Sequence, residues 1–121
     1  EPVSAVWDDI KTFPNLCKVS ISPWCDEEFM GQQLKGSKII YHRKPSPNYL
    51  GVGETMDEEG LRKHIQKTLK AAEGCTLEFT QRDVYTLLLY HRPKVKYKNL
   101  AKKCKCFVES SDSFKQKNPF W

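Results

Sequence analysis

The chain has 121 residues, and 39% of them are hydrophobic, which is enough apolar material for one compact domain. The longest fully apolar run, residues 87–90, is far too short to cross a bilayer, and the sequence does not open with a basic segment followed by an apolar stretch. We therefore expect no membrane anchor. The net charge of +5 is concentrated in residues 92–105, which hold seven Lys or Arg and no acid, so the rest of the chain is nearly neutral.

Cysteines are scattered along the chain, at Cys17, Cys25, Cys75, Cys104 and Cys106. An odd number of cysteines at irregular spacing is unlike the even sets that form disulfide frameworks in small secreted domains. The pattern predicts reduced thiols and a cytoplasmic location.

A short helix and a strand are the first elements expected. Residues 3–13 carry Val6, Trp7 and Ile10 at helical spacing and stop at Pro14. Residues 16–21 then alternate apolar and polar side chains, the period of a strand with one buried face.

A second helix and strand follow. Asp26 can cap a helix that ends at Gly36, a residue that readily adopts the left-handed conformation. Residues 38–42 have the composition of a strand, and a long loop rich in Pro and Gly comes after them.

The clearest element is a helix over residues 56–73. Thr55 and Glu58 form a capping box before it, and Gly74 ends it. Its apolar positions share one face: Leu61, Ile65, Leu69 and Ala72. Exposed ion pairs at i,i+4 are expected for Glu58 with Arg62 and for Glu59 with Lys63.

Residues 75–80 alternate as a third strand, and Pro93 can start a last helix that runs to about residue 104. Strands separated by helices predict parallel pairing with right-handed crossovers. The carboxyl ends of the three strands then meet at one edge of the sheet, where ligand sites of such folds usually lie.

Three segments of the chain, residues 19–26, 42–47 and 82–86, resemble an uncharacterised branch of the uroporphyrinogen decarboxylase-like proteins. The resemblance runs over residues 16–86. It implies an α/β fold in which residues 1–106 form three parallel β-α units, similar to the C-terminal portion of a (β/α)8 TIM barrel. Residues 107–121 are expected to be a polar tail.

The resemblance implies either a cofactor-free tetrapyrrole decarboxylase or a zinc-dependent methyltransferase that works with corrinoid proteins. Decarboxylases of the family carry a Gln-Gly-Asn-type strand end where this chain has His42, Arg43 and Lys44, and a His-Gly-type end where it has Arg82 and Asp83. The methyltransferases bind zinc through a His-x-Cys pair, and no His stands two positions before Cys25. We therefore expect a fragment that is inactive alone, with no metal site and no cofactor identified.

Candidate site residues lie at the strand ends. His42, Arg43 and Lys44 form a cationic set suited to a carboxylate or phosphate, although an exposed charge run beside a turn explains them equally well. Trp24 is a further candidate for substrate binding. The neighbouring Cys25 is either a reactive thiolate or, more simply, a buried thiol beside a capping Asp.

At the third strand end, Asp83 is a candidate general base oriented by Arg82, and Tyr85 can donate a hydrogen bond to a substrate. A structural salt bridge between Arg82 and Asp83 is the alternative. The Cys104-Lys105-Cys106 triplet lacks the second ligand pair that zinc sites need.

A second functional hypothesis is a noncatalytic binding module that uses the basic segment, residues 92–105, to contact nucleic acid or an acidic partner. Most basic helices are solvated faces, and this segment belongs to no recognised nucleic-acid module, so nucleic acid is the less favoured partner. Open sheet edges are expected to pair with other chains, including further copies of this one, and no membrane is expected as a partner.

Overall fold

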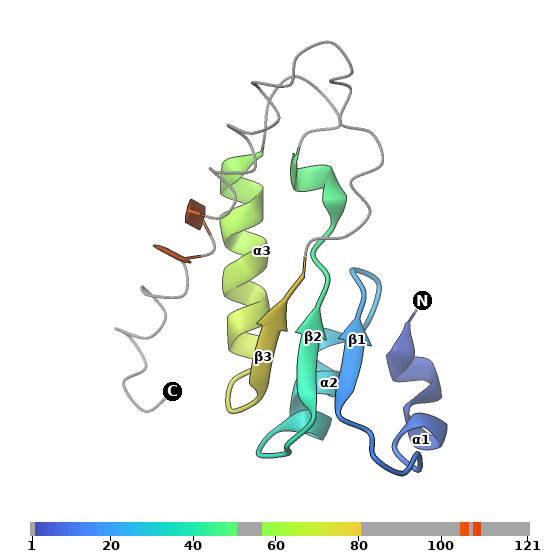
Figure 1. Cartoon of the computed structure of the whole chain (residues 1–121). Coiled ribbons are helices and arrows are strands. Elements are labelled where there is room, and N and C mark those ends of the chain that lie inside the picture. The colour runs from blue at the N-terminus through green and yellow to red at the C-terminus, as the bar shows by residue number, and fades with distance from the viewer. Residues whose placement is uncertain (1, 51–56, 81–104, 107, 110–121) are drawn as a thin grey trace. The chain divides into compact units, whose positions relative to one another are not determined.

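The computed structural model describes residues 2–50, 57–80, 105–106 and 108–109, which are drawn as ribbon in Figure 1. The chain divides into two compact units. The first holds residues 1–45 and 68–80, and the second holds residues 46–67 and 81–121. Helix α3 (Glu58–Ala71) gives its last turn to the first unit and the remainder to the second.

A parallel sheet forms the centre of the first unit (Figure 1). Its three strands lie in chain order: β1 (Lys18–Ile21), β2 (Ile40–Arg43) and β3 (Thr76–Phe79). The register places Ser20, His42 and Glu78 in one row across the three strands. The expected α/β class and the parallel pairing are confirmed.

The helices of the first unit cover the same face of this sheet. Helix α2 (Glu27–Leu34) connects β1 to β2, and the connection from β2 to β3 ends in the last turn of α3. Right-handed crossovers between parallel strands in chain order place successive helices on one side. The two helix backbones approach so closely that a Cβ on Gly31 of α2 would lie 1.8 Å from the carbonyl oxygen of Ala71. Only glycine fits at this position.

The covered face of the sheet carries the core of the first unit. Side chains from the strands, from α2 and from the chain on either side of them pack together there, namely Trp7, Val19, Ile21, Cys25, Met30, Leu34, Tyr41, Ala72 and Cys75. Because successive side chains of a strand point to opposite faces, the residues between these form the other face. We call it the open face, and its members are Lys18, Ser20, Ile40, His42, Thr76 and Glu78.

The N-terminal helix predicted over residues 3–13 is confirmed in a shorter form. It consists of a 3-10 turn, η1 (Val3–Val6), followed by the single α-turn α1 (Trp7–Ile10). Trp7 is buried, and its indole Nε1 donates to Oε1 of Gln33 at 3.0 Å. This bond ties the N-terminal segment to α2.

The limits of α2 follow from the residues that the sequence predicts to set them. The Asp26 carboxylate accepts from the backbone N–H of Phe29 at 3.0 Å, and Gly36 has a φ of +70°. Strand β2 begins at Ile40, two residues later than predicted. The reason is a local turn in which the Ser37 hydroxyl donates to the Leu34 carbonyl and accepts from the N–H of Ile39, so residues 37–39 do not join the ladder.

In the second unit, α3 shows the predicted apolar stripe, with Leu61 and Ile65 fully buried. The predicted cap at Thr55 lies outside the described residues. Helix α3 starts at Glu58 after Asp57, whose carboxylate accepts from the N–H of Gly60 at 2.9 Å. A 3-10 turn, η2 (Pro47–Leu50), precedes it in this unit.

Side-chain contacts in the second unit include both predicted ion pairs of α3. Arg62 lies 3.0 Å from Glu58, and Lys63 lies 2.7 Å from Glu59. Arg62 also contacts Glu109, and these two carboxylates raise the pKa of its guanidinium. None of the helices in the described part of the chain is both long enough and apolar enough to span a membrane.

Candidate functional site

Strand alternation separates two residues that adjoin in the sequence. His42 lies on the open face, whereas Arg43 lies on the covered face beneath the helices. The cationic set expected at this strand end is therefore divided between two environments. One is a buried ion pair around Arg43, and the other is a charged group on the open face around His42.

The Arg43 guanidinium is completely buried, and its nitrogens are surrounded by acceptors. Nη2 donates to Oε1 of Glu27 at 2.7 Å, and Nη1 donates to the carbonyls of Ile21 at 3.1 Å and Ser22 at 2.5 Å. Nε lies 3.4 Å from the Thr68 hydroxyl. Arg43 thus joins β2 to the end of β1, to α2 and to the last turn of α3.

The Glu27 carboxylate completes this buried network. Its Oε2 accepts from the Thr68 hydroxyl at 2.5 Å, while its backbone carbonyl accepts from the Tyr41 hydroxyl at 3.4 Å. Burial, with a smaller contribution from the negative charge of Glu27, raises the pKa of Tyr41 well above its usual value. Anion binding by Arg43 stays a prediction, and an incoming anion would have to compete with Glu27 for the guanidinium.

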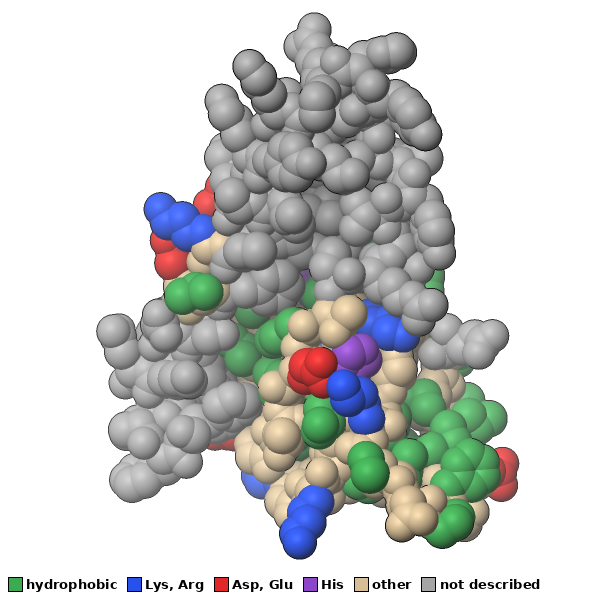
Figure 2. All heavy atoms as spheres, in the orientation of Figure 1, with side chains coloured by type: hydrophobic (Ala, Val, Ile, Leu, Met, Phe, Trp, Pro, Cys, Tyr) green, Lys and Arg blue, Asp and Glu red, His purple; other side chains and the backbone are tan. Residues whose placement is uncertain are grey.

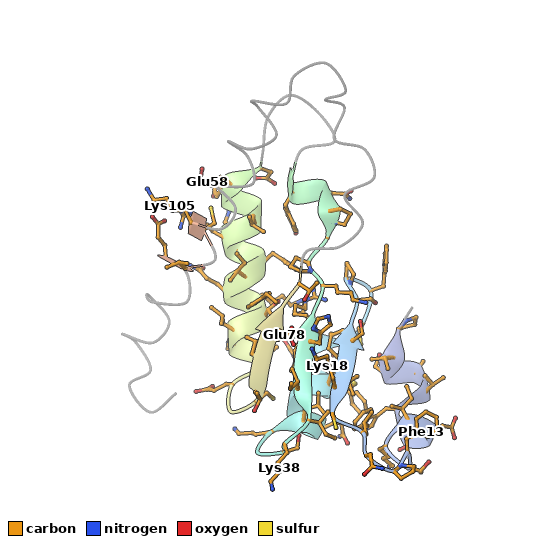
Figure 3. All side chains as sticks on the ribbon, viewed as in Figure 1. Phe13, Lys18, Lys38, Glu58, Glu78 and Lys105 are labelled. Carbon is orange, nitrogen blue, oxygen red and sulfur yellow. The ribbon has the colours of Figure 1, made fainter. Side chains whose placement is uncertain are left out.

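Three charged or titratable side chains meet on the open face, one from each strand. Lys18 Nζ lies 2.6 Å from Oε2 of Glu78, and Nδ1 of His42 lies 3.3 Å from the same oxygen. Figure 3 labels Lys18 and Glu78, and Figure 2 shows a Lys or Arg, an acidic side chain and a His gathered together over the strands. We call Lys18, His42 and Glu78 the open-face cluster.

Lys18 and His42 both stabilise the negative charge of Glu78. The pKa of Glu78 is lowered mainly by its bond with Lys18, against an opposing effect of desolvation, and to a smaller extent by His42. Nδ1 of His42 is buried and lies within ion-pair distance of Glu78, but among the described residues it has no hydrogen-bond partner.

Two other predicted residues adjoin the strand ends. Trp24, in the connection between β1 and α2, is 76% exposed. Lys44 is half-buried, and its backbone N–H donates to the Ile21 carbonyl, so it extends the pairing of β2 with β1. Cys25 is buried beside these residues, which agrees with the simpler of its two interpretations.

The third predicted group, Arg82, Asp83 and Tyr85, lies outside the described residues, as does most of the basic segment at residues 92–105. Their roles stay predictions. Within the described ranges, no group of three or more His, Cys, Asp or Glu side chains is arranged to hold a metal ion. The cysteines at positions 17, 25, 75 and 106 are free thiols.

Comparison of the chain with protein-family models, with curated proteins and with solved structures found no match. The site is therefore interpreted from its own geometry. Sequence reasoning overlooked Lys18, Glu27, Thr68 and Glu78 as members of the two groups. The sequence did contain a signal for Glu78, because it occupies a polar position of an alternating strand. Parallel pairing of the three strands places such polar positions side by side in one row across the sheet.

Proposed function

We propose that this chain is the C-terminal part of a cytoplasmic α/β barrel protein similar to the uroporphyrinogen decarboxylase-like family, and that it is inactive by itself. One observation carries the proposal: the three parallel strands follow one another in chain order, with the helices of the unit on one face. A closed (β/α)8 barrel repeats this arrangement, whereas a doubly wound sheet reverses its strand order and places helices on both faces.

In a closed barrel, the face away from the helices turns inward, and the residues at the carboxyl ends of the strands surround the ligand. The open-face cluster would then line the interior. Trp24, Lys44 and His42 would contribute to a site for a small anionic substrate, with Arg82 and Asp83 as the catalytic pair and Tyr85 beside them. The substrate class and these roles rest on the resemblance and on strand-end placement.

The proposed inactivity of the isolated chain rests on the small number of strands in the described residues. A barrel active site collects groups from several strand ends, and correct positioning of reacting groups can lower a barrier by about 7–11 kcal/mol. The three strands of the described residues supply only part of such a site. The family activities, tetrapyrrole decarboxylation and corrinoid-linked methyl transfer, would therefore require the strands of further β-α units.

The incomplete sheet also predicts association through its edges. The carbonyls of Cys17 and Ile21 accept hydrogen bonds from β2, so by alternation the peptide groups of Ser20 point away from β2, toward the outer edge of β1. No strand of the described residues pairs with this edge, and an unpaired edge readily pairs with another strand. The partners expected are strands of the missing units or of further copies of this chain.

Light scattering on the purified chain tests the association. We expect oligomers in the wild type and fewer of them in Ser20→Pro, which removes the outward N–H, with Ser20→Ala as the matched control that retains it. A cooperative monomer in the wild type would refute the partial-barrel proposal.

Anaerobic assays with uroporphyrinogen, and with methylcobalamin plus a thiol in the presence and absence of zinc, test the inactivity. No turnover is expected with either substrate. Turnover that is lost in Cys25→Ser or Asp83→Asn would show that the chain is an enzyme in its own right.

A further inference from the structure

The two outer strands of the sheet carry opposite charges on the open face. Lys18 belongs to β1, and Glu78 belongs to β3. Within one chain the two side chains meet across β2, where Lys18 Nζ lies 2.6 Å from Oε2 of Glu78. His42 contacts the same oxygen, so Oε1 of Glu78 can accept from the lysine of another copy. One edge of the sheet is therefore basic and the other acidic, and the two edges complement each other.

The covered face of β3 is less completely buried than that of β1. Val19 and Ile21 of β1 retain 3% and 0% of their surface. The corresponding residues of β3, Leu77 and Phe79, remain half-buried. Helices normally cover the strands of a parallel sheet. The apolar side of β3 therefore has surface left to bury against a further helical segment.

The N-terminal segment, residues 3–13, offers apolar side chains on the β1 side of the sheet (Figure 1). Val3 and Ile10 of this segment pack against the core. Val6 and Phe13, each three positions further along, are 49% and 60% exposed. Residues three apart lie on the same side of a helical turn, so the apolar stripe of the segment continues past the core. Figure 2 shows hydrophobic side chains gathered over this part of the molecule.

We propose that copies of this chain associate head to tail, with β3 of one copy pairing in parallel beside β1 of the next. The contact rests on the association through sheet edges proposed above. Lys18 of the second copy then lies on the strand adjacent to Glu78 of the first, and the N-terminal segment of the second copy covers the apolar side of β3 in the first. Because the contact joins two different edges, each end of the assembly keeps an edge to which a further copy can add.

Charge makes the pairing of like edges less favourable. Two β1 edges would bring the Lys18 side chains of both copies together, and two β3 edges would do the same for Glu78. Like charges that face each other on adjacent strands are destabilising. Head-to-tail pairing alternates the two signs, and it keeps the helices of both copies on one face of the extended sheet.

Charge reversal separates a contact between copies from the contact within one chain. Sedimentation velocity and light scattering are measured for Lys18→Glu, for Glu78→Lys and for an equimolar mixture of the two. Both side chains are nearly half exposed, so their reversal is compatible with folding. Each variant alone places like charges on the two paired edges, and its apparent dissociation constant should rise at least about tenfold above the wild-type value.

The mixture is the decisive sample. Every contact between the two variants again joins opposite charges, so association should return to the wild-type strength. The pair within each chain stays broken, so only a contact between copies explains the recovery. General attraction does not explain it either, because the wild type carries +5 and both variants keep a positive net charge.

Matched controls carry the same changes away from the sheet edges. Lys38→Glu and Glu73→Lys alter exposed positions outside the strands, and both should associate as the wild type does. Val6→Ser should weaken association more than Val108→Ser, because Val108 is also exposed but belongs to the second unit. Far-UV circular dichroism verifies that each variant is folded.

Two results would overturn the head-to-tail contact. One is association of either charge variant at the wild-type strength, and the other is a mixture that does not recover. Both results leave the partial-barrel proposal standing, since oligomers of the wild type would then form through other contacts. A wild-type chain that is monomeric refutes the partial barrel and this contact together.

Discussion

Replacement of Glu27 by leucine should destabilise the first unit more than any exposed charge substitution. Arg43 is completely buried and Glu27 retains only 7% of its surface, so Glu27→Leu leaves a guanidinium in the interior without its carboxylate. Removal of one partner from a buried ion pair typically costs about 3–5 kcal/mol. The free energy of unfolding of a domain is about 5–15 kcal/mol, so this loss is a large part of the total.

The double variant Glu27→Leu, Arg43→Met tests the physical reason for that loss. Replacing both members of a buried pair by apolar side chains is often neutral or stabilising. In the double variant the carbonyls of Ile21 and Ser22 also lose the Arg43 donor, and each lost hydrogen bond lowers the free energy of unfolding by at most roughly 1–3 kcal/mol. We therefore expect the double variant to unfold at a higher urea concentration than Glu27→Leu alone, although below the wild type.

Urea unfolding followed by far-UV circular dichroism and by tryptophan fluorescence measures these differences. Glu59→Leu is the matched control, since the carboxylate of its pair with Lys63 is 80% exposed and such pairs contribute about 0–1 kcal/mol. If Glu27→Leu falls within 1 kcal/mol of Glu59→Leu, the assignment of Arg43 to a buried network is wrong.

Three further variants test helix packing, capping and alkaline stability. Gly31→Ala should lower the free energy of unfolding by at least about 1–3 kcal/mol, because its Cβ would lie 1.8 Å from the carbonyl oxygen of Ala71. Gly36→Ala has open space around the new Cβ but a φ of +70°, so it should lower the free energy of unfolding by about 1–2 kcal/mol. Urea midpoints of the two variants measure this difference. Asp26→Ala removes the cap of α2 and should cost about 0.5–2 kcal/mol in the same assay, with Asp26→Asn closer to the wild type. The raised pKa of Tyr41 means that the fold favours its neutral phenol, so the stability that this preference contributes is complete below pH about 10 and is lost as the pH rises further. The urea midpoint of the wild type should therefore fall more steeply between pH 9 and 11 than that of Tyr41→Phe. Parallel slopes would contradict the burial of a neutral Tyr41 phenol.

The local elements of this protein were largely predictable because their signals are local. Asp26 caps α2 through a bond to a residue three positions away, and the apolar stripe of α3 repeats within single turns. The parallel order followed from the alternation of strands and helices. The sequence placed the start of β2 two residues too early. The Ser37 hydroxyl accepts from the N–H of Ile39, and this local bond competes with a strand-to-strand hydrogen bond for the same N–H.

The site depended on long-range relations that no local pattern contains. His42 and Arg43 are consecutive, yet alternation directs one to the open face and the other beneath the helices. The carboxylates that meet them, Glu78 and Glu27, come from segments 36 and 16 residues away, and Thr68 comes from a third segment. The alternation of β2 did indicate that Arg43 is buried, because Arg43 lies two residues after Tyr41 and therefore on the same face of the strand.

For the described residues, the sequence alone therefore indicated the helices, the strands and their parallel direction, since these depend on propensity, capping and the period of apolar residues. Only the tertiary structure decided which carboxylate faces which cation. The register of three strands and the close contact of α2 with the end of α3 bring those groups within hydrogen-bonding distance. Electrostatic pairing falls off with separation in space, and separation along the chain has no direct influence on it.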